Sequence, residues 1–229
     1  MHIYTDKDKT IMLPSVTSIL SFVKFKPEYE ALIKWSNSLG FKHKSYNKTL
    51  DATADFGTLV HEVISKIVTH QEIPKELYSK VSFEDMDKFN TTISNFMKFH
   101  ANLPSETIYS EKSFLSKELG YAGTVDWISK EDNQIILTDF KTSSAVRDYM
   151  PMQLAAYRKL IEAHTKYKIN KARIILVSSP SFKIENYSLE QLDESYEMFE
   201  KIFELYKLYT SKHLDSQDAN ENSLIIVND

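Results

Sequence analysis

Several long stretches of the chain carry apolar residues at the spacing of an α-helix. The clearest is 56–70, where apolar residues recur every three or four positions and form a continuous stripe. A second stripe of this kind fills 82–101, with Ser82 as the expected N-cap and Asp85 three positions later. The pattern predicts long helices at residues 27–39, 56–70, 82–101, about 150–168 and 188–213.

Capping residues mark some of the expected helix ends. Gly40 follows the helix predicted over 27–39 and is its expected stop, because glycine readily takes the left-handed conformation there. Ser188 and Gln191 form a capping box for the last helix. Residues 15–20 follow a proline and are expected to form a short capped helix.

The region between the helices has the pattern of β-strands. Residues 106–114 alternate in polarity, 172–179 form a continuous apolar run, and 182–187 are expected to form another strand. Within 120–141, two runs rich in β-branched and aromatic residues flank a polar cluster centred on the Asp-Asn pair at 132–133. This pattern predicts a β-hairpin, so three consecutive strands are expected here.

The expected turn fixes the register of the hairpin. If the turn is centred on the Asp-Asn pair, the numbers of paired residues sum to 265, and Asp126 faces Asp139. Directly opposed like charges destabilise a strand pair, so two carboxylates at this place need a reason, and a divalent cation is the simplest one. Lys141 lies two residues beyond Asp139 and points to the same face.

Both faces of the hairpin carry apolar residues. Burial on both sides implies central strands with helices above and below, and therefore an α/β fold. One face is predicted to hold Val125, Trp127, Ile136 and Phe140, and the other Ile128, Ile135 and Leu137.

Length and composition favour one domain. The chain has 229 residues, 42% of them hydrophobic, which is enough to bury a core. An N-terminal helical segment is expected over about 14–50, the core over about 51–187, the C-terminal helix over about 188–213 and a mobile tail over 214–229. Residues 223–227 of this tail could add an edge strand or bind a partner.

Composition also excludes several kinds of site. The chain has no cysteine, so it can form no disulfide, no thiolate zinc site and no cysteine-ligated iron–sulfur cluster. Its first residues lack an apolar signal core, and no window approaches the ~20 apolar residues of a membrane span. An intracellular, soluble protein that does not enter a membrane is therefore expected.

Charge is distributed unevenly along the chain. The formal net charge is -4, but residues 21–50 carry +4 and residues 185–229 carry -8. The segment 41–55 is polar and non-periodic, and its lysines at 42, 44 and 48 stand beside two aromatic residues. Such a mixture suits single-stranded nucleic acid, although a flexible surface loop explains it equally well.

The order of these elements, with acids on the second and third strands, resembles the core of the PD-(D/E)XK nuclease superfamily, and most closely its RecB-type exonuclease branch. Two departures are evident: Val125 replaces the proline of the family name, and the cysteines of iron–sulfur members are absent. The resemblance covers roughly residues 14–180. The N-terminal part, Pro14–Leu20, resembles the opening of phage and mitochondrial genome-maintenance exonucleases. The residues that carry the rest of the resemblance are His61 in residues 57–61, Glu111, Asp126 in residues 123–126, residues 139–143, and Gln153 with Tyr157.

The resemblance implies a restriction-endonuclease-like core in the order αβββαβ, with helical additions at both ends, and Mg²⁺ or Mn²⁺ as cofactor. The oxygen ligands of the metal would be Asp126, Asp139 and the backbone carbonyl of Phe140. His61 would add a nitrogen ligand, which favours Mn²⁺, and Glu111 would join the metal shell or act through water. Lys141 would orient the attacking water or stabilise the transition state, supported by Gln153 and Tyr157.

The implied substrate is DNA, cut without sequence specificity from free ends or on single strands, because backbone contacts carry no base information. Replication, recombination or repair would be its setting, with a possible partner protein, in the cytoplasm of a bacterial or phage-infected cell. Candidate backbone contacts are Ser15, Thr17, Lys42, Lys44, Lys48, Thr142, Ser143 and Arg147.

Other functions remain open at this point. The chain could be a DNA-binding or assembly subunit that keeps the fold without using the site, or a structure-selective endonuclease. Each candidate residue also has an ordinary explanation. His61 alone would more often be a hydrogen-bonded histidine at the edge of the core, and Asp139 with Lys141 could be a surface charge pattern.

Overall fold

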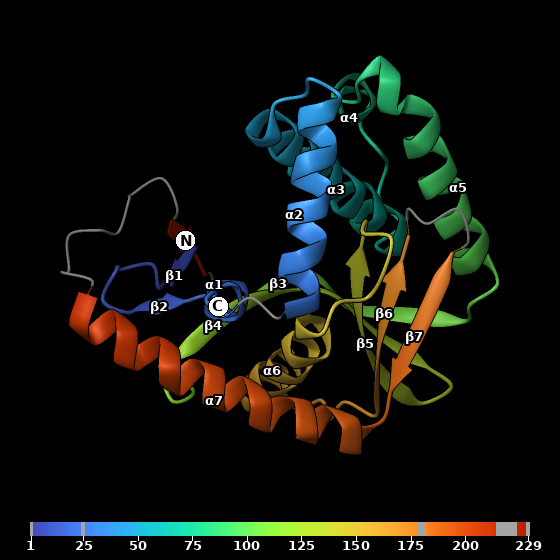
Figure 1. Ribbon diagram of the computed structural model, residues 1–229. Helices are drawn as coiled ribbons and strands as arrows, with labels where there is room; N and C mark the ends of the chain where they lie inside the picture. Colours follow the sequence, from blue (N-terminus) through green and yellow to red (C-terminus); the bar gives the residue numbers. More distant parts are fainter. Residues whose placement is uncertain (1, 24–25, 178–181, 214–223, 228–229) are drawn as a thin grey trace.

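A five-stranded mixed sheet forms the centre of the fold (Figure 1). The computed structural model describes residues 2–23, 26–177, 182–213 and 224–227. The strand order is β3-β4-β5-β6-β7, antiparallel except for the parallel pair β5 and β6. The strands are β3 (Ser105–Ser116), β4 (Tyr121–Glu131), β5 (Gln134–Lys141), β6 (Lys171–Leu176) and β7 (Lys183–Tyr187).

Helices cover both faces of this sheet. On one face, α3 (Tyr46–Val68), α4 (Lys75–Ser79) and α5 (Met86–Ala101) pack on Trp127, Phe140 and Ile175. On the other face, α1 (Val16–Ser21), α6 (Tyr149–His164) and α7 (Leu189–His213) pack on Ile128, Leu137 and Ile174. The predicted α/β fold, with a central mixed sheet between helices in the order αβββαβ, is confirmed.

The hairpin between β4 and β5 has the predicted register. From Trp127↔Thr138 to Glu131↔Gln134, the numbers of the paired residues sum to 265. Asp132 and Asn133 have φ values of 46° and 65°, as a two-residue type I′ turn requires. The regular ladder ends at Trp127 and Thr138, one step before the two aspartates.

The alternation of side chains breaks at Asp126. Val125 and Ile128 both pack on the α6 side of the sheet, whereas Trp127 packs on the α5 side and Asp126 reaches α3. The prediction that Val125 shares a face with Trp127 is therefore wrong, because it assumed an uninterrupted period of two.

The polar, non-periodic segment 41–55, for which a flexible surface loop was one of two explanations, is mostly helical. α2 (Lys26–Phe41) runs through Gly40, which is therefore not its stop, and α3 begins after the N-cap Ser45. Residues 47–55 are almost all exposed, so they carry no apolar stripe. This is the reason why periodicity alone could not show the first turns of α3.

Four short elements were not predicted, two of them in the segment before α5 and two at the N-terminus. The segment before α5 contains α4 and a 3₁₀ turn, η1 (Phe83–Asp85), and Ser82 caps that turn as expected. A second sheet has the order β2-β1-β8, from β2 (Met12–Pro14), β1 (Ile3–Thr5) and β8 (Leu224–Ile226). β8 confirms the edge-strand alternative for the tail, so the tail is not mobile there, while residues 214–223, 228 and 229 lie outside the described residues.

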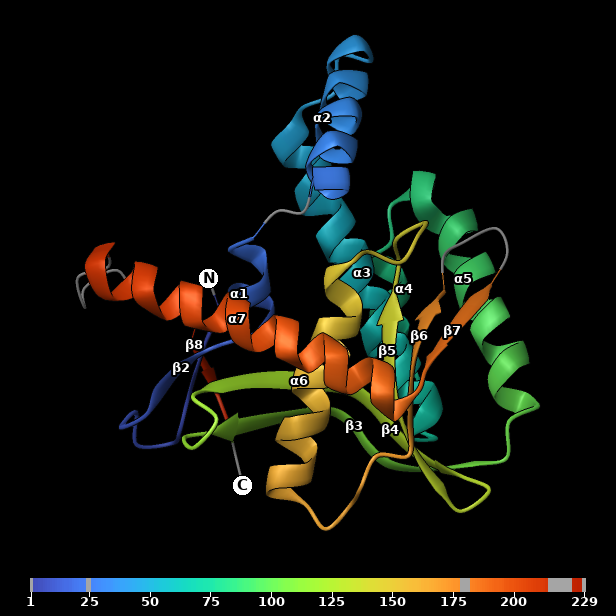
Figure 2. The same cartoon turned by 60° about the horizontal axis from the view of Figure 1, so that its bottom comes forward.

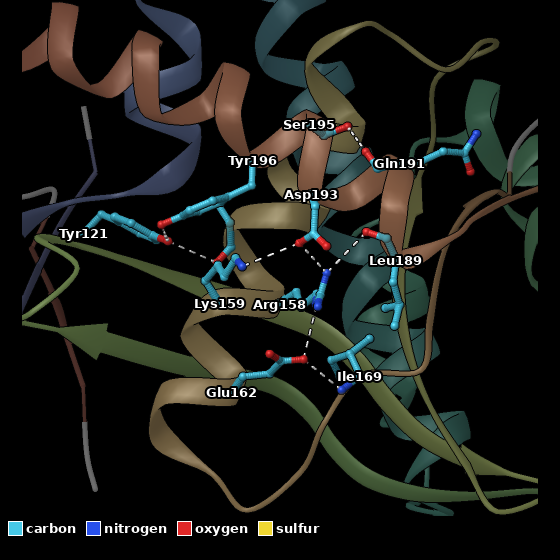
Figure 3. A network of polar contacts seen from close by, with 11 residues as sticks. Tyr121, Arg158, Lys159, Glu162, Ile169, Leu189, Gln191, Asp193, Ser195 and Tyr196 are labelled. Atoms are coloured by element: carbon cyan, nitrogen blue, oxygen red, sulfur yellow. Dashed lines mark hydrogen bonds and ion pairs between the residues drawn. The ribbon is translucent and has the colours of Figure 1, made fainter.

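A network of polar contacts joins α7 to α6 and the sheet (Figure 3). Arg158 on α6 contacts Glu162 Oε1 at 3.2 Å and Asp193 Oδ1 at 2.9 Å, so it bridges the two helices. Tyr121 on β4 donates to the hydroxyl of Tyr196 at 3.2 Å. The predicted capping box at Ser188 and Gln191 starts α7, which is thereby held along the sheet.

Across the described ranges, no helix has the length and apolar character needed to cross a membrane.

Candidate metal centre

Three metal-ligating side chains converge from three different elements. His61 comes from the middle of α3, Glu111 from β3 and Asp126 from β4. The Nδ1 atom of His61 lies 3.4 Å from Asp126 Oδ1 and 3.7 Å from Glu111 Oε1. One ligand atom from each lies within 4.8 Å of the others, so the three could hold one metal ion.

The backbone at Glu111 is strained. Its φ is +50°, a value rare for a residue with a side chain, in the middle of a strand. In the ladder between β3 and β4, Ser110 pairs with Trp127 and Lys112 with Val125, so the residues left between these pairs are Glu111 and Asp126. Strain of this kind persists where surrounding structure enforces it and is common at functional sites. Here the strained residue is one of the three converging side chains, and Asp126 lies at the same gap in the pairing.

Asp139 and Lys141 extend the cluster along β5. The Nζ atom of Lys141 lies 2.6 Å from Asp139 Oδ2, and the carboxylate is only 3% exposed. Asp139 Oδ1 is buried without a hydrogen-bond partner, and the contact of Oδ2 with Lys141 is an ion pair rather than a well-directed hydrogen bond. A buried carboxylate oxygen without a partner is costly unless a cation compensates it, so this residue fits a metal site.

Asp126 also fastens β4 to β5. Its Oδ2 atom accepts a hydrogen bond from the backbone N–H of Phe140 at 2.7 Å, which replaces the regular ladder at this point. One oxygen of the carboxylate therefore holds the strand, while the other faces His61. This contact explains how two aspartates can lie at the end of one hairpin without facing each other in a regular pair.

The charges of the cluster shift one another's titration. Burial disfavours the imidazolium of His61, but Asp126 and Glu111 outweigh this and raise its pKa to about 10. Burial raises the pKa of Asp139 to about 6 although Lys141 opposes the shift. For Asp126, His61 and Lys141 outweigh burial and keep the pKa low. A bound cation would compete with the proton on His61, since metal binds neutral imidazole.

Gln153 and Tyr157 lie together on α6, as their spacing predicted. The Nε2 atom of Gln153 donates to the Tyr157 hydroxyl at 2.9 Å, and both side chains are buried. Burial and then Asp139 and Asp126 hold the pKa of Tyr157 well above its usual value. The ring of Tyr157 lies against Gly123, where a Cβ atom would be 2.5 Å from it. Gly123 therefore leaves the space that Tyr157 fills.

A pocket of about 250 Å³ adjoins Lys141. It is lined by α1 and α6, including Thr17, Tyr149 and Gln153. A second, more open hollow of about 600 Å³ follows α3 beside His61 and Glu111. Open space therefore borders the cluster at Lys141 and, separately, at His61 and Glu111.

The candidate DNA contacts have different surroundings. Thr17 is exposed at the pocket, and Gly57 of α3 lies close to the hydroxyl of Thr142. Ser15 is 2% exposed and caps α1 through Ser18, so its hydroxyl is committed to the fold rather than open to DNA.

The remaining candidates lie beyond the cluster. Ser143 donates its hydroxyl to the Ala145 carbonyl at 2.9 Å, and the Arg147 backbone N–H contacts the sulfur of Met150. Lys42, Lys44 and Lys48 are exposed at the far end of α3 and do not join the cluster.

Sequence reasoning missed a hydroxyl chain next to the site. Tyr4 on β1 is bonded to Thr124 Oγ1 at 2.8 Å, which is bonded to Ser113 Oγ at 2.7 Å. Ser113 and Thr124 are a cross-strand pair two residues from Glu111 and Asp126. The short β1 was not predicted, so nothing in the sequence indicated that Tyr4 lies here.

The chain is similar to known proteins at the level of sequence family and of overall structure. The model of the PD-(D/E)XK nuclease superfamily matches residues 34–219. Among solved structures, an exonuclease candidate from Eubacterium rectale matches with a TM-score of 0.46 and 11% identity, covering 73% of each chain. The protein SSO0001 matches with a TM-score of 0.32 and 14% identity, covering 67% of this chain and 74% of its own. No curated protein matches the sequence. Since the family model covers most of its length, the chain belongs to the PD-(D/E)XK nuclease superfamily.

Proposed function

We propose that this nuclease is a metal-dependent DNA exonuclease that hydrolyses phosphodiester bonds without sequence specificity, from free ends or on single strands. The observation that carries the proposal is the convergence of His61, Glu111 and Asp126 beside a buried Asp139 with an unpartnered oxygen. Nuclease chemistry comes from the family, and the choice of exonuclease rests on the resemblance of residues 14–20 to the genome-maintenance exonucleases.

The ligand set would hold Mg²⁺ or Mn²⁺, hard cations that prefer oxygen donors. His61, Asp126 and Asp139 would bind the ion, with the Phe140 carbonyl as a further donor and Glu111 in the shell or acting through water. The imidazole nitrogen favours Mn²⁺. When bound, the ion acidifies a water molecule and neutralises charge on the phosphate.

The chain's own residues have separate tasks in this proposal. Lys141 orients the attacking water or stabilises negative charge on the phosphate, and for this it gives up its ion pair with Asp139. It takes this role because, among the described residues, its ammonium group alone lies within ion-pair distance of a carboxylate of the cluster. Tyr157 and Gln153 stay neutral and hydrogen-bonded, so they can support Lys141 and the phosphate without adding charge. Thr17, Thr142, Ser143 and Arg147 would contact the DNA backbone.

The test uses labelled single- and double-stranded DNA with Mg²⁺, Mn²⁺ or EDTA. Wild type should cut only with metal, and Asp139→Asn and Lys141→Ala should lose activity by at least two orders of magnitude. Lys130→Ala, which changes an exposed lysine near the hairpin turn, is the matched control and should remain active. DNA binding without any cleavage would instead favour a DNA-binding or assembly subunit.

Closed circular DNA separates an exonuclease from an endonuclease. An exonuclease has no end from which to start on this substrate, so circles should persist while linear strands of the same sequence disappear. Nicking of the circles would refute the exonuclease proposal and leave the nuclease assignment in place.

A further inference from the structure

A helical hairpin projects from the body of the molecule. It consists of α2 and the N-terminal half of α3, which stand above the sheet in Figure 2. Trp35 and Tyr46 pack edge to face at 5.5 Å near the turn between the two helices. Most other side chains of residues 42–55 are exposed, so this hairpin contributes little to the core.

The tip of the hairpin is basic and aromatic. Residues 41–50 include Lys42, Lys44 and Lys48 and no acidic residue. The three lysines are exposed and take part in no ion pair with any described residue. Phe41 is 88% exposed at the same place. Unpaired ammonium groups beside an exposed aromatic ring suit a nucleic-acid strand, whose phosphates attract the former and whose bases stack on the latter.

One face of α3 connects this tip to the metal centre. Asn47, Leu50, Ala54, Gly57 and His61 follow one another at alternating spacings of three and four, so they share that face. None of them is acidic, and the positions before His61 are exposed or half-buried. A strand lying on this face would meet small and uncharged side chains before it reaches His61.

The length of α3 sets the reach of this contact. Sixteen residues separate the N-cap Ser45 from His61, which is ~24 Å at 1.5 Å per residue. Each strand of duplex DNA advances 3.4 Å per nucleotide, so ~24 Å corresponds to about seven nucleotides of a strand stacked as in duplex DNA.

We propose that this hairpin is a remote second binding site for the substrate, which holds the phosphate backbone at Lys42, Lys44 and Lys48 about seven nucleotides from the bond that is cut. The inference rests on the proposed nuclease function and adds a length requirement to it. Strands too short to reach the tip are bound at the metal centre alone, whereas longer strands are bound at both places. The substrate class is therefore a polynucleotide rather than a short oligonucleotide.

The test compares single strands of 4 and 20 nucleotides. The triple variant Lys42→Gln, Lys44→Gln, Lys48→Gln should cut the long strand about tenfold or more slowly in kcat/KM at low salt and cut the short strand at the wild-type rate. Its binding to the long strand, measured by fluorescence anisotropy, should lose about two units of salt slope, since each phosphate contact on a single strand contributes ~0.7.

The matched control carries the same charge change at another place. Lys130, Lys168 and Lys171 are exposed at the opposite end of the sheet, near the hairpin turn of β4 and β5. Changing these three to glutamine should leave the length preference and the salt slope unchanged.

The outcomes separate the two proposals. If wild type cuts both strands and the tip variant keeps the wild-type length preference and salt slope, the remote site is refuted and the nuclease proposal stands. If wild type with metal cuts neither strand, both proposals fail. A Phe41→Ala variant that loses affinity for the long strand only would support the tip as the contact.

Discussion

Replacing Gly123 by alanine should displace Tyr157 from the candidate site. The added Cβ would lie 2.5 Å from one ring carbon of Tyr157 and 3.2 Å from the next. Carbon atoms pack at about 3.5–4.0 Å, so the ring must move by more than an ångström. Tyr157 is fully enclosed and bonded to Gln153, and it therefore has no free direction in which to turn.

The expected cost of this substitution is that of overpacking a core, about 1–3 kcal/mol. The backbone of Gly123 is not in the left-handed region, so alanine adds no conformational strain and the clash alone is measured. Urea denaturation gives the stability loss, and cleavage of linear DNA gives the loss of activity. Since the ring and its hydrogen bond move together, activity should fall at least tenfold.

Two further variants make the reasoning refutable. Gly40→Ala adds the same methyl group inside α2, where nothing lies within 4 Å, and should be neutral or stabilising by up to about 1 kcal/mol. In a Tyr157→Ala background the clash is absent, so Gly123→Ala should cost close to nothing there. Equal costs of Gly123→Ala in both backgrounds would refute the steric argument.

Three other predictions concern charge and hydrogen bonding. In metal-free protein His61 has a pKa of about 10, above its unfolded value of 6.5. The contribution of its charge to stability is therefore complete below pH 6.5 and lost as the pH rises through 10. The stability difference between wild type and His61→Gln, measured in EDTA, should shrink between these two pH values. Arg173→Ala should lower the free energy of unfolding by about 3–5 kcal/mol, measured by urea denaturation. The reason is that it leaves the mostly buried carboxylate of Glu131 without its contacts to Arg173 at 2.6 and 2.9 Å. The double variant Arg173→Met with Glu131→Leu should recover most of this loss. Tyr4→Phe should cost about 1 kcal/mol, and Thr124→Val about 1–2 kcal/mol because it also breaks the bond to Ser113. Together they should cost less than the sum, because both remove the bond between Tyr4 and Thr124; full additivity would contradict this shared bond.

The hairpin shows which parts of the fold local rules can predict. Its register followed from the Asp-Asn turn, since both residues take positive φ and only one pairing then places the flanking strands. The capping box of α7 and the N-cap of η1 were equally local and were confirmed. By contrast, the first turns of α3 carry no buried side chain, and a solvent-exposed helix has no apolar period to find. β1 and β8 pair with each other although they lie more than 200 residues apart in the sequence, so no local sequence pattern could predict their pairing.

The candidate site was predictable in its residues but not in its geometry. Asp126 was identified from the hairpin register, and Glu111 and His61 from the resemblance to the nuclease superfamily. An ideal ladder would have placed Asp126 opposite Asp139 and away from His61. The structure departs from the ladder there: Glu111 takes a φ of +50°, the alternation of β4 changes at Asp126, and Asp126 bonds to the backbone of Phe140. The strained backbone at Glu111 and the interrupted alternation at Asp126 cost free energy that regular pairing would have supplied, and both turn a carboxylate toward His61. A divalent cation at that place would offset the cost by compensating the converging carboxylates of Glu111 and Asp126, so the binding of metal should stabilise this corner of the sheet more than any other part of the fold. Hydrogen exchange measured with and without Mn²⁺ tests this directly: protection should rise at residues 109–112, 125–127 and 139–141, and an unchanged or uniform pattern would show that the strained strands serve the fold alone.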